Sequence, residues 1–151
     1  MIEILNEDCM AVMARYPDNH FDYIVCHCVW MYTDREKSLR EMIRVLKPGG
    51  KIYLGAIADL GWYPKLIWQA LKKGDRRLFV ESLRAMARGV QISEKTARNL
   101  MGKIGLKTFK IGFDSQLGRS EIKVKPIYER SFFGMRIVYE ILAEKPMQHT
   151  K

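Results

Sequence analysis

Cysteine and histidine side chains gather at Cys26-His27-Cys28, directly after the apolar, β-prone residues 21–25. Thiolate and imidazole groups are zinc ligands, so a metal site is one chemistry that this triplet could support. Two features argue against it. Side chains alternate along a strand, so His27 points away from its two neighbours, and no second pair of ligands follows in the sequence. The sequence therefore predicts no metal site.

A second candidate group is aromatic and consists of Trp30, Tyr32, Trp62, Tyr63 and Trp68. Such side chains can enclose a small molecule in a water-poor pocket, or they can pack helices against a sheet. Neither His20 nor Tyr53 has a sequence neighbour that would make it a general base. The sequence predicts no catalytic residue and leaves both interpretations of the aromatic group open.

The segments that must position these residues alternate between strand and helix. Strand patterns lie at 2–5, 21–26 and 51–55, with helices after the first and second of them. The first helix is expected at 9–15. Asp34 is a suitable N-cap for the second, and Pro48-Gly49-Gly50 ends it because proline cannot continue a helix. This alternation predicts an α/β layered fold with a parallel sheet, in which 21–26 is a buried strand.

The remainder of the chain begins with a helical hairpin at 61–90, in which Gly74-Asp75 separates two amphipathic helices. Ser93 is the expected N-cap of a further helix that closes at Gly105. Strands at 107–113 and 135–143 follow without a helix between them, which predicts an antiparallel pair joined by a long loop or ribbon at 114–130. We expect 1–151 to form one domain, with 61–90 as a helical insertion.

Three stretches resemble the class I S-adenosylmethionine (SAM)-dependent methyltransferase family. Asp8 with 17–25 is similar to the acidic residue after the family's third strand and to its PDNSFD approach to the fourth. Residues 39–50 are similar to the helix and RVLKPGG turn before the fifth strand, which is the most specific of the three matches. Residues 94–107 and 138–145 resemble the last helix and the terminal strand.

The resemblance implies an N-terminally truncated Rossmann-like sheet of about five strands, the last two antiparallel, and methyl transfer from SAM to a small-molecule acceptor. The family's GxGxG loop, whose backbone approaches the cofactor closely, is absent from the sequence. In the family's strand order, 3-2-1-4-5-7-6, the two strands between the third and the fourth are missing. A second chain or another copy could supply them, 2–5 could pair directly with 21–26, or the sequence could be a fragment.

Residue roles follow from the resemblance position by position. Asp8 would contact the adenine amine and Cys9 the adenine plane, while Cys26, His27 and Cys28 would line the methionine end of SAM. Asp8 is equally well explained as the cap of the helix after it. Direct methyl displacement requires mainly positioning and a dry pocket, so the substrate pocket would consist of Trp30, Tyr32, Trp62 and Tyr63.

Composition limits the remaining choices. Three cysteines in 151 residues and no apolar leader or membrane span predict a cytoplasmic protein with free thiols. The net charge of +9 is compatible with a nucleic-acid partner, and Lys and Arg concentrate between residues 65 and 88. The alternative to an enzyme is a non-catalytic methyltransferase-like subunit that binds protein or nucleic acid.

The opening residues also resemble amino-directed DNA methyltransferases, a family that would suit the positive charge. In that family the strand that corresponds to 21–26 ends in an Asp-Pro-Pro-Tyr-type motif that binds the target amine. Here the strand ends in Cys26-His27-Cys28-Val29, so we reject this assignment.

Overall fold

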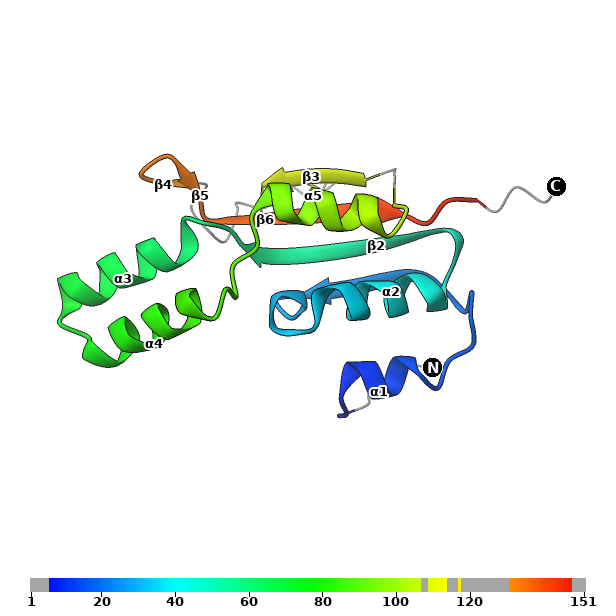
Figure 1. Cartoon of the computed structure of the whole chain (residues 1–151), viewed down its shortest axis with the longest axis horizontal. Helices are drawn as coiled ribbons and strands as arrows, with labels where there is room; N and C mark the ends of the chain where they lie inside the picture. The colour runs from blue at the N-terminus through cyan, green and yellow to red at the C-terminus, as the bar shows by residue number, and fades with distance from the viewer. Residues whose placement is uncertain (1–5, 107–108, 114–116, 118–130, 148–151) are drawn as a thin grey trace.

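The computed structural model describes residues 6–106, 109–113, 117 and 131–147 (Figure 1). Five α-helices and one 3-10 helix lie in this part of the chain: α1 (Cys9–Met13), η1 (Trp30–Tyr32), α2 (Arg35–Val45), α3 (Trp62–Lys73), α4 (Arg76–Ala87) and α5 (Glu94–Lys103). The strands are β1 (Phe21–His27), β2 (Leu46–Ala58), β3 (Phe109–Phe113), β4 (Ser131–Phe132), β5 (Met135–Arg136) and β6 (Val138–Glu144).

Four strands form the main sheet in the order β1-β2-β6-β3. β1 and β2 are parallel, whereas β6 is antiparallel to both of its neighbours. This order corresponds to strands 4-5-7-6 of the methyltransferase sheet, so the predicted α/β fold with a final antiparallel pair is confirmed. The predicted strand at 2–5 and most of the segment 114–130 lie outside the described residues.

Local sequence signals explain where the helices begin. Asp34, Asp75 and Ser93 each accept a hydrogen bond from a backbone N–H three residues ahead, which satisfies a donor that the first helical turn leaves unpaired. α2 ends at Val45 and β2 begins directly at Leu46, so Gly49 lies inside β2, where the register of its pairing with β1 is irregular. Its φ of +75° is a conformation that glycine adopts without a Cβ penalty. The strand is longer than predicted, because its pairing with β6 continues to Ala58.

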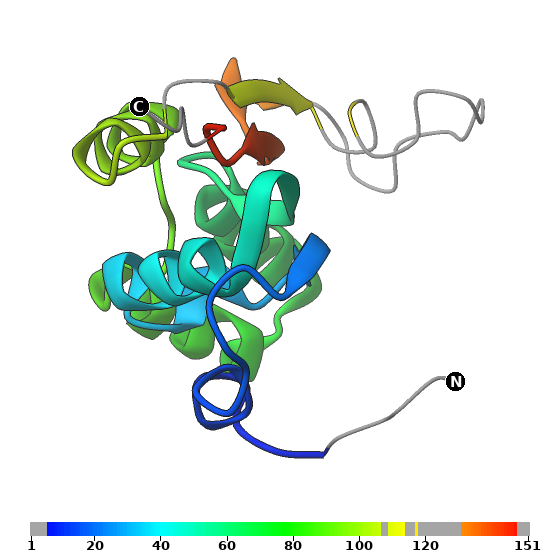
Figure 2. The ribbon, with the colours of Figure 1, turned by 90° about the vertical axis from the view of Figure 1, so that its right-hand side faces the viewer.

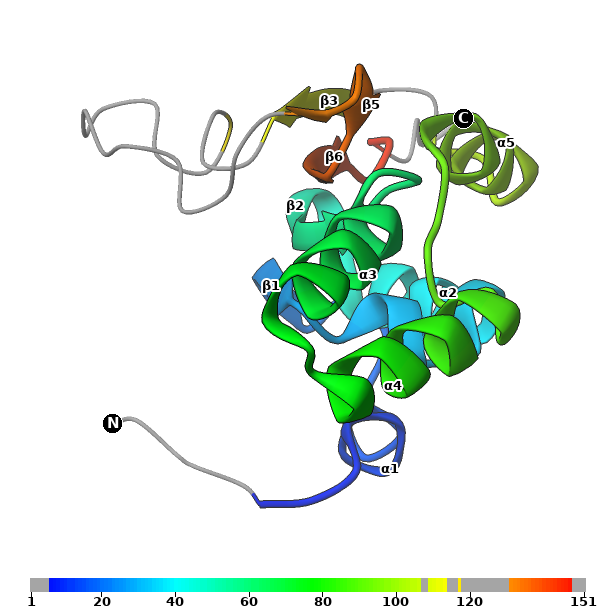
Figure 3. The same cartoon turned by 90° about the vertical axis from the view of Figure 1, so that its left-hand side faces the viewer.

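The core lies on one face of the sheet, where α2 and α5 pack. Figures 2 and 3 view the molecule from opposite sides, and both place these helices on the same side of the strands. Leu39 and Met42 of α2 and Met101 of α5 are buried against Ile52 and Ile141 of the sheet. Burial of this apolar surface is the main stabilising contribution to the fold.

The interpretation of 21–26 as a buried strand is wrong. β1 is the end strand of the sheet, and its Tyr23 and Val25 side chains are 48% and 63% exposed. The apolar sequence of β1 suits a strand with neighbours on both edges and helices on both faces. Among the described residues, β1 pairs only with β2, and the helices that cover the sheet lie on the opposite face, with Ile24 and Cys26.

α3 and α4 form the predicted helical hairpin, which projects beyond the end of the sheet (Figure 1). The small β4–β5 hairpin lies beside α3 and was not predicted. Within the described residues, no helix combines the length and the apolar character needed to cross a membrane.

Candidate functional site

The carboxyl ends of the parallel strands β1 and β2 form the edge of the sheet that carries the candidate site. His27 is paired in register with Gly55, and the Cys28 N–H donates to the Gly55 carbonyl oxygen at 3.1 Å. The chain then turns through η1, while β2 continues past this point to Ala58. In open α/β sheets, ligands bind at the carboxyl ends of the strands, so this edge is where a site is expected.

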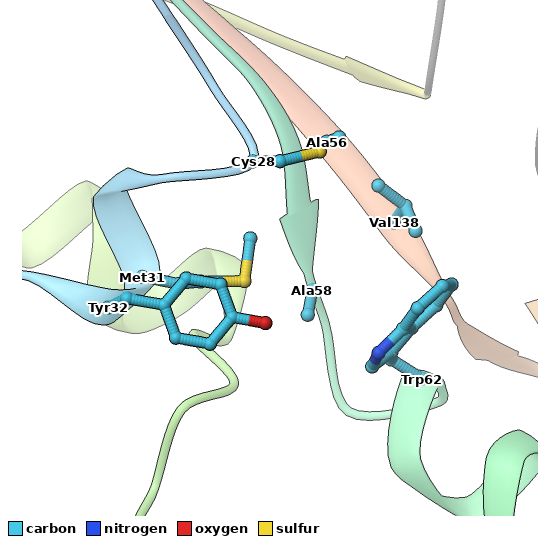
Figure 4. A pocket seen from close by; sticks show the side chains of 7 residues that line it. All are labelled: Cys28, Met31, Tyr32, Ala56, Ala58, Trp62 and Val138. Carbon is cyan, nitrogen blue, oxygen red and sulfur yellow. The ribbon is translucent and has the colours of Figure 1, made fainter. Parts of the chain in front are cut away.

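A small cavity of about 60 Å³ lies at this edge (Figure 4). Its walls come from the β1–η1 connection, from β2, from the start of α3 and from β6, and consist of Cys28, Met31, Tyr32, Ala56, Ala58, Trp62 and Val138. The Tyr32 ring and the Trp62 indole stand on opposite sides of Ala58, and the Tyr32 hydroxyl points between them. In this state the cavity has room for only a few waters.

Two of the lining residues have a backbone conformation that L-residues rarely adopt. Cys28 and Ala56 have φ values of +60° and +51°. The left-handed conformation costs a non-glycine residue roughly 1–2 kcal/mol, and such residues cluster at functional sites. Ala56 lies at the irregularity in the β2–β6 register, between Leu54 and Ile57. Both strained residues face the same cavity, which supports its assignment as the site.

Tyr32 also links the cavity to the helical hairpin. It hydrogen-bonds to Tyr63, which is 4% exposed, although Tyr63 itself does not line the cavity. Burial raises the pKa of Tyr63 to about 12, and the neighbouring Tyr32 contributes to the increase. The Tyr63 hydroxyl is therefore neutral near neutral pH, suited to hydrogen bonding rather than to removing a proton.

Three of the predicted cofactor-binding residues are cysteines that lie near one another: Cys9, Cys26 and Cys28. Cys9 and Cys28 lie close enough to Cys26 to influence its titration, and Cys26 itself packs against the core. Burial raises the pKa of the Cys26 thiol, although the Trp30 and Val29 N–H groups lower it, and the thiols of Cys9 and Cys28 add to the increase. Among the described residues, no group of three ligating side chains is placed to hold a metal ion.

Asp8 caps α1 by accepting hydrogen bonds from the N–H groups of Met10 and Ala11, at 2.9 and 3.1 Å. Trp30 is 1% exposed, and its indole N–H donates to the Arg35 carbonyl oxygen at 3.1 Å. It supports the site from the core and does not line the cavity. Trp68 lies away from the cavity, on the outer side of α3.

His27 lies on the opposite face of the sheet, beside Tyr53. A Cβ built on Gly55 would lie 2.4 Å from His27 Nδ1 and 3.0 Å from the Tyr53 hydroxyl, so only glycine allows this close approach. The Tyr53 hydroxyl donates to the buried Glu140 carboxylate, which also accepts from the Leu117 N–H. No partner of Tyr53 is predicted from the sequence, although a single acidic residue, Glu140, inside the apolar segment 137–143 is a signal that could have indicated one.

Whether these residues fit the cofactor that the resemblance implies can be judged from the cavity. Sites for molecules of cofactor size enclose roughly 300–1,000 Å³, whereas the cavity beside Cys28 measures about 60 Å³. The described residues therefore do not enclose SAM in this state.

Comparison with known proteins agrees with this architecture. Residues 2–54 match the family model described as a methyltransferase domain. A segment of 38 residues is 53% identical to the ubiquinone/menaquinone biosynthesis C-methyltransferase UbiE of Vibrio cholerae, covering 24% of this chain. The match spans 15% of the length of that relative.

Two solved structures share the fold. A SAM-dependent methyltransferase from Archaeoglobus fulgidus superposes with a TM-score of 0.56 at 13% identity, covering 93% of this chain and 66% of that one. A SAM-dependent methyltransferase from Thermotoga maritima gives a TM-score of 0.52 at 21% identity, covering 87% and 59% of the two chains. The β1-β2-β6-β3 strand order and these superpositions show that the chain has the Rossmann-like fold of SAM-dependent methyltransferases, and residues 2–54 are similar to the methyltransferase domain family.

Proposed function

We propose that this chain is the acceptor-binding half of a SAM-dependent methyltransferase, and that β-strands from a second polypeptide pair with β1 to complete the cofactor site. The observation that carries the proposal is the exposure of β1 at the end of the sheet. β1 is the end strand of the described sheet, with Tyr23 and Val25 exposed on the face opposite the core. Added strands would pair its outer backbone groups, and the helices that accompany them would cover these side chains.

The acceptor in this proposal is a small molecule held at the carboxyl ends of β1 and β2. Tyr32 and Trp62 supply facing aromatic walls, and the strained residues Cys28 and Ala56 form the floor. Tyr32 is 66% exposed and can move to enlarge the cavity when a ligand enters. Methyl transfer by direct displacement requires alignment and exclusion of water, which these side chains provide without a dedicated base.

The cofactor would lie on the β1 side of the same edge. SAM, when bound, supplies the electrophilic methyl group. Cys28 borders the cavity, and Cys9 and Cys26 lie near it. We assign Cys26 and Cys28 to the methionine end of SAM, Cys9 to the adenine plane and Asp8 to the adenine amine. His27, which was predicted to share the methionine end, lies on the opposite face of the sheet beside Tyr53 and is left out of this assignment. The role of Asp8 as the α1 cap occupies one of its oxygens, Oδ1.

The cellular setting belongs to the same proposal. Cys9, Cys26 and Cys28 form no disulfide bonds, as expected for a protein of the reducing cytoplasm. We expect the working form to be an assembly of this chain with the partner that pairs with β1, because an exposed edge strand is a template for further pairing.

The test is titration calorimetry of SAM and S-adenosylhomocysteine into the purified chain, with light scattering on the same sample. We expect no binding up to about millimolar ligand. Binding should become micromolar when a polypeptide that carries a strand and a GxGxG loop is added. Micromolar binding by the monomeric chain alone would contradict the need for a partner. If binding remains absent in the presence of the partner, the alternative of a non-catalytic binding subunit is favoured.

A matched pair of variants tests the acceptor cavity in the reconstituted enzyme. Ala58→Leu places three extra carbons in the small cavity, and we expect loss of methyl transfer with the affinity for SAM retained. Ala87→Leu makes the same change at an exposed position of α4 and should leave both unchanged. Equal activity of the two variants would contradict the assignment of this cavity.

A further inference from the structure

A second concave surface lies on the far side of α3, away from the cavity described above. We call it the hairpin groove. It has a volume of about 360 Å³. Its lining includes Ile67, Trp68, Leu71, Met86, Phe132 and Phe133. α3, α4 and the β4–β5 hairpin form it. Figure 1 shows α3 and the β4–β5 hairpin side by side at one end of the molecule, and these two elements are in contact.

The groove keeps large apolar side chains in contact with water. Phe133 is 78% exposed, Leu71 is 60% exposed and Trp68 is 43% exposed. The Trp68 and Phe133 rings meet edge to face with centroids 6.2 Å apart, so the exposed surface is continuous from α3 to the β4–β5 turn. Contiguous exposed apolar surface of this kind indicates an interaction site.

α3 is apolar on two sides, and only one of them serves the fold. Tyr63 and Ala70 are buried on the inner side. The outer side carries three further apolar residues that line the groove: Ile67, Trp68 and Leu71. Leu71 follows Ile67 by four residues and Trp68 by three, so the three side chains share one face of the helix. The inner stripe explains why the helix packs where it does. The outer stripe has no such explanation within the described residues.

Basic residues follow the groove residues of α3 along the chain, and one of them contacts the groove. The α3–α4 turn carries Lys72, Lys73, Arg76 and Arg77, all exposed. Lys72 Nζ lies 5.1 Å from the Trp68 ring centroid, so positive charge and apolar surface adjoin directly. The acidic residue of this turn, Asp75, is engaged as the N-cap of α4. The turn therefore presents net positive charge beside exposed aromatic rings.

We propose that the hairpin groove docks on the surface of an anionic phospholipid bilayer. In this arrangement Phe133, Trp68 and Leu71 enter the boundary between headgroups and acyl chains, and Lys72, Lys73, Arg76 and Arg77 contact lipid phosphates. An amphipathic helix with aromatic and aliphatic residues on one side and basic residues beside them binds membranes in this way. Trp and Phe exposed next to Lys suit this boundary, because it is apolar on one side and charged on the other.

The proposal is independent of methyl transfer, so its test requires no cofactor. The chain is sedimented with vesicles of phosphatidylcholine alone, or of phosphatidylcholine mixed with phosphatidylglycerol. We expect binding to the mixed vesicles, weaker binding to phosphatidylcholine, and weakening by salt. Absence of binding to the mixed vesicles, or equal binding to both kinds, would overturn the proposal.

Two paired variants separate the apolar and the charged contributions. Leu71→Ser combined with Phe133→Ser should reduce binding at least about tenfold, since both side chains are largely exposed and their loss leaves the fold intact. Lys72→Gln combined with Lys73→Gln should reduce binding and its dependence on salt. Val25→Ser with Val29→Ser removes apolar groups, and Lys37→Gln with Lys95→Gln removes charges, at exposed positions elsewhere, and both should leave binding unchanged.

Other occupants of the groove would give different results. If light scattering shows that the wild type is a dimer and that Leu71→Ser with Phe133→Ser is a monomer, the groove is an interface between copies and the proposal is wrong. If Lys72→Gln with Lys73→Gln abolishes binding to RNA while the wild type does not sediment with vesicles, the basic turn serves nucleic acid and the proposal is equally wrong. Circular dichroism of each variant verifies that it is folded.

Discussion

Arg136 connects three parts of the structure, and its removal provides the sharpest test of the energetics. Its Nε donates to Asp59 Oδ2 at 2.7 Å, and its Nη1 lies 2.8 Å from Glu94 Oε2. The guanidinium also stacks 4.5 Å from the centroid of the Tyr139 ring. These contacts join the end of β2, the start of α5 and the β5–β6 segment beside the candidate site. We predict that Arg136→Met strongly destabilises the fold.

The magnitude follows from burial. The Asp59 side chain is only 8% exposed, so removal of its partner leaves a carboxylate that is largely shielded from water and uncompensated. Breaking a buried ion pair in this way costs about 3–5 kcal/mol. A domain of ordinary stability has about 5–15 kcal/mol in total, so the variant should lose a large part of it.

Equilibrium unfolding in urea, monitored by circular dichroism, measures the change. Arg40→Met is the matched control, because its ion pair with Glu36 is exposed and should contribute less than about 1 kcal/mol. Adding Asp59→Asn to Arg136→Met removes the buried charge and should restore part of the stability. The reasoning would be refuted if Arg136→Met cost no more than Arg40→Met, or if the added Asp59→Asn restored nothing.

Three further predictions concern other contacts. Burial is the main cause that raises the pKa of Tyr63 to about 12, so the protonated hydroxyl stabilises the folded state. This stability is complete below the unfolded pKa of 10.0 and is lost as the pH rises toward 12. Tyr63→Phe should therefore flatten the decline of the urea unfolding midpoint across this pH range. Lys145→Met removes hydrogen bonds of 2.8 and 2.7 Å to the Ile43 and Leu46 carbonyl oxygens, and should cost about 1–3 kcal/mol in urea unfolding; a change below about 0.5 kcal/mol would contradict this. Gly61→Ala would place a Cβ 2.6 Å from the Met135 carbonyl oxygen, and should lower the unfolding midpoint and shift Trp62 fluorescence, whereas the exposed Gly102→Ala, which meets no atom within 4 Å, should do neither.

Acid should also weaken the fold through Glu94. Burial raises the pKa of this carboxyl, but hydrogen bonds from Arg98 and Arg136 outweigh it, and the net result is a lowered pKa. A lowered folded-state pKa gives stability that is present above the unfolded value of 4.5 and is lost as the pH falls through the folded value. Glu94→Gln should therefore reduce the loss of stability below about pH 4.5.

Helix starts and strand pairs could be predicted from the sequence, because the signals for them are short-range. Asp34, Asp75 and Ser93 mark helix starts through side-chain hydrogen bonds to residues three positions ahead. Pro48 cannot continue a helix, and α2 ends at Val45, three residues before it. The antiparallel β3–β6 pair followed from two strand patterns without a helix between them. Caps and turns depend on a few consecutive residues, so sequence is sufficient to place them.

Only the tertiary structure decided which side chains meet and which remain exposed. Tyr53 and Glu140 are 87 residues apart, and only the β2–β6 pairing brings them together. Ala56 carries no sequence mark of its positive φ, which arises where the β2–β6 register shifts. The sequence of β1 is that of a buried strand, yet Val25 is 63% exposed. Burial depends on what lies on both edges and both faces of a strand, and that information is carried by the neighbouring elements rather than by the strand itself.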